Sequence, residues 1–79
     1  MKPTAKNYIG WYGVLAILLA YILVSFSVIV TKSVAYQLLN LTGAVGIVIE
    51  AAAKKDAQPV ALNIVWATIA VIALIRIAA

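Results

Sequence analysis

The sequence predicts an all-α fold, a bundle of three helices that span a membrane, and three observations lead to this prediction. Hydrophobic residues make up 67% of the 79-residue chain and charged residues 10%, more apolar surface than a small water-soluble domain can bury. The apolar residues form three charge-free runs, at residues 7–31, 33–49 and 57–75. Each run has close to the roughly 20 helical residues that cross a hydrocarbon layer about 30 Å thick.

The first predicted span covers about residues 8–30. Tyr8, Trp11 and Tyr12 gather at its beginning. Aromatic rings with a polar edge favour the headgroup region, so this cluster is expected to set the depth of the helix in the bilayer. The rest of the span is rich in Leu, Ile and Val, which lipid tolerates because a helix satisfies its own backbone hydrogen bonds.

The second and third predicted spans cover about residues 34–53 and 59–77. The first connection is only a few residues long, which favours antiparallel neighbours. Ser33 is suited to the N-cap of the second helix. Pro59 suits the first turn of the third helix, where its missing N–H costs nothing. With no room for an extramembrane domain, residues 1–79 are expected to form a single membrane domain.

The charged residues of the chain predict its orientation and its partners. Six cations give a net charge of +4, but they are scattered at the ends of the apolar runs, so we expect the lipid bilayer as partner and no nucleic acid. Lys2, Lys6, Lys54 and Lys55 fall on one side, and Lys32 and Arg76 fall on the other. The positive-inside rule then puts the N-terminus in the cytoplasm and the C-terminus outside. The expected location is the inner membrane of a bacterium, as a multi-pass protein.

The absent residue types limit the chemistry that this chain could perform. The sequence contains no Cys and no His, which removes thiol catalysis and the usual ligands of zinc and haem. Paired carboxylates for acid–base hydrolysis are also missing from any single site. We therefore expect no enzyme activity, no cofactor and no metal site.

Small and polar residues recur at helical spacing along each predicted span. In the second span they are separated by four, three, four and three residues, which places them on one helix face. Helices in lipid associate through close backbone approach and hydrogen bonds, because apolar burial gains little there. The residues expected to pack helices or bind a partner are Gly13, Ala16, Ala20, Tyr36, Asn40, Gly43, Ile47, Ala67 and Ala70.

Two sets of polar residues also allow a sharper interpretation. Asn40, Asn63 and Trp66, with Tyr36, could line a solute pocket instead of serving helix packing. Glu50 could couple protons or cations, as carboxylates within membranes often do. It also lies four residues before Lys54, and this spacing predicts an ion pair at the interface instead.

Several short segments give the chain a family resemblance. Ile9-Gly10-Trp11, Gly43, the loop from Asp56 to Pro59, and Leu62-Asn63-Ile64-Val65 occur in an order that resembles the bacterial half-transporters of the SemiSWEET and PQ-loop superfamily. The chain also looks like a group of short bacterial three-span membrane proteins. The resemblance implies a parallel homodimer in which each copy forms half a pore and Asn63 contacts a sugar.

The same alignment shows two departures from those half-transporters. Leu23-Val24 stands where they carry Pro-Gln, so the proline hinge is missing. Ile47 stands near the position of their pocket Trp. We therefore expect a small non-catalytic membrane protein that packs through its small and polar faces, as a homodimer or as an accessory subunit of a larger complex. A SemiSWEET-like transporter of sugar-type solutes, working as a parallel homodimer, is the alternative.

Overall fold

The computed structural model describes residues 5–79, and these residues form helices and turns without a strand. Helix α1 covers Ala5–Ser25, α2 covers Val34–Ala53 and α3 covers Ala57–Ala78. All three are long and apolar enough to cross a membrane. The all-helical prediction is thus confirmed, while Lys2, which entered the predicted charge count, lies outside the described residues.

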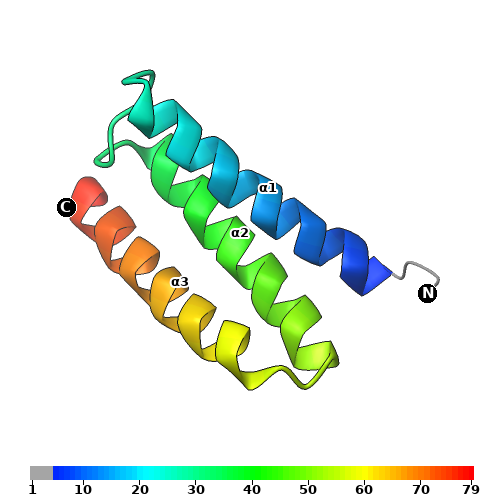
Figure 1. Ribbon diagram of the computed structural model, residues 1–79. Coiled ribbons are helices and arrows are strands. Elements are labelled where there is room, and N and C mark those ends of the chain that lie inside the picture. Colours follow the sequence, from blue (N-terminus) through cyan, green and yellow to red (C-terminus); the bar gives the residue numbers. More distant parts are fainter. Residues whose placement is uncertain (1–4) are drawn as a thin grey trace.

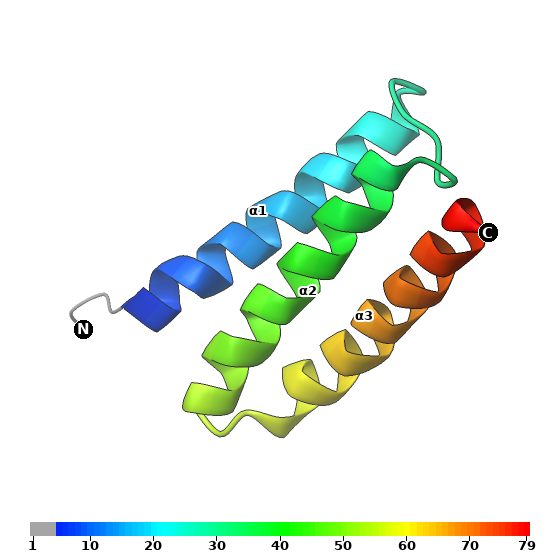
Figure 2. The ribbon, with the colours of Figure 1, turned by 180° about the vertical axis from the view of Figure 1, so that it is seen from behind.

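Helix α2 lies between the other two helices, as both views of the ribbon show (Figures 1 and 2). Within residues 5–79, no Cα of α1 comes within 8 Å of a Cα of α3. Each outer helix therefore packs on α2 alone, and the bundle is a single layer of helices.

Glycines bring the backbones of α1 and α2 into direct contact. A Cβ added to Gly43 would lie 2.9 Å from the carbonyl oxygen of Gly13, and one added to Gly46 would lie 2.7 Å from that of Ile9. Both distances are shorter than the 3.4 Å at which ordinary van der Waals contact begins. This close approach gives the two helices the dispersion contacts on which association in lipid depends.

Helix α1 ends at Ser25, earlier than the expected span to residue 30. Ser27 adopts a left-handed conformation with φ 62°, and the N–H of Val28 donates to the carbonyl of Leu23 at 2.8 Å. The N–H of Ser27 donates to Val24 at 3.1 Å, which completes a Schellman cap. The backbone therefore leaves the helix although the side chains from Phe26 onward remain apolar.

The two helices that follow are also set by local hydrogen bonds at their ends. The Ser33 side chain accepts from the N–H of Tyr36 at 3.1 Å, as expected of an N-cap. A second Schellman cap ends α2, where Lys55 has φ 58° and the N–H of Asp56 donates to Ala51 at 2.9 Å. Helix α3 then begins at Ala57, so Pro59 falls within its first turn.

Candidate functional site

One pair of polar side chains links α2 to α3. The indole Nε1–H of Trp66 donates to Oδ1 of Asn40 at 2.9 Å. The Nδ2 of Asn40 donates to the carbonyl of Tyr36, one turn earlier on the same helix, at 2.8 Å. Asn40 is only 4% exposed, whereas Trp66 is 42% exposed. Both Nδ2 and Oδ1 of Asn40 are therefore hydrogen-bonded within the chain.

A groove of about 290 Å³ surrounds this pair. Its lining residues come from the first turn and from α2 and α3: Thr31, Tyr36, Gln37, Asn40, Trp66, Ile69 and Ala70. The walls are mainly apolar, and the polar atoms at Asn40 and Trp66 already bond to each other. A solute that enters the groove would have to compete for that bond or use the remaining polar groups.

Asn63 lies apart from this groove. It is buried, and its Nδ2 donates to the carbonyl of Pro59 at 2.9 Å on its own helix. The structure thus brings Asn40 and Trp66 together but does not place Asn63 beside them in one pocket. The groove therefore contains two of the three residues expected to line a solute pocket, and solute binding stays a prediction.

The residues expected to pack helices take two kinds of position. Gly13, Ala16 and Ala20 are buried on α1, Asn40 and Gly43 on α2, and Ala70 on α3. Tyr36, Ile47 and Ala67 are half-buried. The buried set is used for contacts within the chain, so it presents no free surface to a partner.

Gly10, which was not among the expected packing residues, and Gly46 belong to the same contact. Gly10 and Gly46 are buried between α1 and α2 together with Gly13 and Gly43. The signal was available, because each helix repeats its glycine after three residues and so keeps both on one face. Tyr12 and Thr42 add a hydrogen bond of 2.7 Å across the same pair of helices. No spacing within one helix could reveal that pair.

Glu50 lies at the far end of the α1–α2 contact. Its Oε1 is 3.2 Å from Nζ of Lys54, so the expected ion pair is present in the structure. The same carboxyl group occupies the space that a Cβ on Gly10 would need. A groove of about 300 Å³ lies here, between the beginning of α1 and the end of α2.

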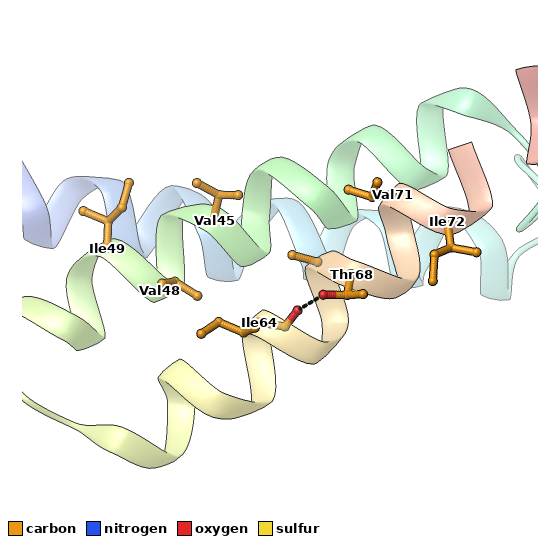
Figure 3. Close-up of a pocket in the computed structure, with 8 residues that line it drawn as sticks. Val45, Val48, Ile49, Ile64, Thr68, Val71 and Ile72 are labelled. Carbon is orange, nitrogen blue, oxygen red and sulfur yellow. Dashed lines mark hydrogen bonds between the residues drawn. The ribbon is translucent and has the colours of Figure 1, made fainter. Parts of the chain in front are cut away.

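A second groove between α2 and α3 is almost wholly apolar. It measures about 400 Å³ and is lined by Val45, Val48, Ile49, Ile64, Ala67, Thr68, Val71 and Ile72 (Figure 3). The Thr68 hydroxyl donates to the Ile64 carbonyl at 2.8 Å, so it is satisfied within its own helix. The groove therefore presents almost only apolar side chains.

The comparisons with known proteins give a family match, and the membrane assignment rests on the helices themselves. Neither a curated protein nor a solved structure matches the sequence. The helices indicate a small multi-pass integral membrane protein. A protein-family model matches residues 6–79, and nothing in that match connects the chain with the SemiSWEET or PQ-loop half-transporters. Because the match covers almost the whole chain, from α1 through α3, the chain belongs to the family that this model describes.

Proposed function

We propose that the chain is a non-catalytic membrane protein that works by associating with other transmembrane helices, as a homodimer or as an accessory subunit of a larger complex. The observation that carries this proposal is the hydrogen bond that Trp66 donates to Asn40. The polar side chains best placed to hold a solute instead hold α3 on α2. If Asn40 and Trp66 serve helix packing, the fold does not need to rearrange for them to do so.

The arrangement of the layer supports association with further helices. Helix α1 and helix α3 each contact α2 on one side, and most of their remaining surface is exposed. Between the helices of residues 5–79, the two turns are too short to fold as a separate domain. A partner would therefore meet the chain within the bilayer, on the outer faces of the layer.

Cysteine cross-linking tests this proposal directly, since the natural chain contains no cysteine. Leu15 on α1, Val45 on α2 and Ile69 on α3 are exposed and lie on three different helices. In liposomes that contain only this chain, a homodimer should give a disulfide-linked dimer from one of these single-cysteine variants and not from the other two. Purification from native membranes in mild detergent tests the accessory role by co-migration. A solitary monomer in both experiments would refute the proposal.

A solute transporter remains the second candidate, because the groove at Asn40 and Trp66 has room for a small polar molecule. Uptake of sugars into proteoliposomes measures this activity. Asn40→Ala should abolish transport through the groove, whereas Asn63→Ala should leave it nearly intact, since Asn63 does not line the groove. The absence of uptake by the unmodified protein would exclude this candidate.

Glu50 is assigned here to an ion pair at the membrane surface and not to proton or cation coupling. Its pairing with Lys54, four residues later on α2, supports that role. If the protein takes up sugars into proteoliposomes, uptake that persists in a Glu50→Gln variant would agree with this assignment. Loss of a pH-dependent sugar uptake in that variant would support proton or cation coupling instead.

The proposed location is the inner membrane of a bacterium, with the N-terminus in the cytoplasm and the C-terminus outside. The charge count along the chain supports this orientation. A reporter enzyme that works only in the cytoplasm should be inactive when fused after Ala79. Strong reporter activity would mean that the orientation is reversed.

A further inference from the structure

A large cleft opens at the end of the layer formed by the α1–α2 turn and the C-terminal end of α3. Its volume is about 640 Å³, and it is lined by Thr31, Lys32, Gln37, Ala73, Arg76 and Ile77. Lys32 and Arg76 are far apart in the sequence, yet the fold brings both to this cleft. Two cations thus share one concave site.

The turn that carries Lys32 is held in place by side chains. The Nε2 of Gln37 donates to the carbonyl of Thr31 at 2.9 Å, and Oγ of Ser33 donates to that of Val30 at 2.7 Å. Arg76 comes from the last turn of α3, where a cation is favoured by the helix dipole. Both backbone positions are therefore fixed before any ligand arrives, which reduces the entropy cost of binding.

No acidic side chain neutralises this pair of cations. The chain has two carboxylate side chains, Glu50 and Asp56, and both lie near the α2–α3 turn at the opposite end of the layer. Among residues 5–79, neither Lys32 nor Arg76 forms an ion pair. An anion placed between them would replace their mutual repulsion with two favourable contacts, and the Arg guanidinium matches phosphate geometry especially well.

The cleft is continuous with an apolar surface. Thr31 and Gln37 line both this cleft and the groove that contains Trp66 and Ile69. A ligand that fits both would carry an anionic group at one end and hydrocarbon at the other. Since the cleft lies at the end of helices that span the bilayer, it sits at the level of the lipid phosphates.

We infer that this cleft is a binding site for one anionic phospholipid, with its phosphate between Lys32 and Arg76 and its upper acyl chain against Trp66 and Ile69. Basic pockets between transmembrane helices hold acidic lipid headgroups on the cytoplasmic side of membranes. The same chemistry would act here on the outer side, where the proposed orientation puts Lys32 and Arg76. The inference goes beyond helix association and does not depend on it, because one copy of the chain supplies all the lining residues.

Native mass spectrometry of the detergent-purified chain tests the site with phosphatidylglycerol, and with phosphatidylcholine for comparison. The unmodified chain should retain one phosphatidylglycerol in preference to phosphatidylcholine. The double variant Lys32→Gln/Arg76→Gln should bind it about 30-fold more weakly, as expected for two cations near the headgroups. The matched control, Lys6→Gln/Lys55→Gln, removes two charges at the other end and should change the affinity less than twofold. Equal losses in both double variants would reduce the effect to net charge and overturn the proposal.

A second variant separates a built site from a charged surface. Ala73→Phe keeps both cations but fills part of the cleft, so it should also weaken phosphatidylglycerol binding. Unchanged binding in Ala73→Phe would overturn the proposal, as would full displacement of the lipid by millimolar inorganic phosphate, which would make a free anion the ligand. Circular dichroism checks that each variant keeps its helices. If the double Gln variant loses helix content, two other variants replace it as the test. Lys32→Arg/Arg76→Lys keeps both charges and should retain phosphatidylglycerol, whereas Ala73→Phe should weaken its binding; the opposite results would overturn the proposal.

Discussion

A single methyl group on Gly13 should push α1 away from α2. A Cβ at this position would overlap the carbonyl oxygen of Gly43 and lie 2.8 Å from Cγ1 and 3.0 Å from the backbone nitrogen of Ile47. Two of these three neighbours are backbone atoms of α2, which cannot rotate out of the way. Gly13→Ala can therefore be accommodated only if the helices move apart along their closest contact.

The expected cost follows from two opposing effects. Overpacking a tight contact costs about 1–3 kcal/mol. Ala is a better helix former than Gly by about 1 kcal/mol, which offsets part of that cost. Because two of the three clashing atoms are backbone, the overpacking cost should lie at the upper end of its range, and we expect Gly13→Ala to lower the free energy of unfolding by about 2 kcal/mol. The hydrogen bond of Tyr12 to Thr42, made by the residue next to Gly13, should lengthen at the same time.

Titration with SDS in mixed micelles measures this free energy. Trp11 lies in the groove between α1 and α2 and reports their separation by fluorescence in a Trp66→Phe background. Val14→Ile is the matched control, because it adds one methylene to an exposed side chain of the same helix and should change stability by less than about 0.5 kcal/mol. A Gly13→Ala variant as stable as its parent would show that the backbone contact is not what holds α1 on α2.

Three further changes probe the other contacts of the layer. Trp66→Phe leaves Oδ1 of Asn40 without its donor and should destabilise the α2–α3 contact by about 1–2 kcal/mol, with a coupling energy of about 0.6–1.7 kcal/mol in a double-mutant cycle with Asn40→Ala. Ser27→Gly should raise the thermal unfolding midpoint measured by circular dichroism and Ser27→Val should lower it, since the left-handed conformation costs a residue with a side chain about 1–2 kcal/mol. Gly10→Ala should cost about 1 kcal/mol in SDS titration, because the Glu50 carboxyl can swing aside but Cβ of Glu50, 2.8 Å from the added Cβ, cannot. Glu50→Ala keeps that Cβ, so it should remove only part of the cost.

Hydropathy was sufficient to predict the helices, because the thickness of a bilayer sets both their length and their composition. It could not predict where α1 ends. The residues after Ser25 stay apolar, and the residue that turns the backbone is Ser27 and not the glycine usually found at such a cap. A hydropathy profile records the side chains, whereas this helix end depends on the backbone conformation of one serine.

Helical spacing was similarly informative about faces but not about partners. It placed Asn40 and Gly43 on one side of their helix, and both are buried there. It did not reveal that Asn40, besides donating to a carbonyl on its own helix as Asn63 does, also accepts from Trp66 on another helix. Whether an amide bonds along its helix or across to the next depends on its side-chain conformation and its neighbours, which periodicity does not contain.

The two contacts of α2 are built by different chemistry, and they should respond differently to perturbation. Glycines on both helices, two within one turn of each, bring α1 onto α2, so that contact is made by backbone atoms. Helix α3 depends on one polar link, Asn40 to Trp66, and two grooves run beside its contact with α2. Loss of that link should therefore release α3 before α1. If a partner or a lipid displaces part of this layer, α3 is the helix that the packing leaves easiest to move.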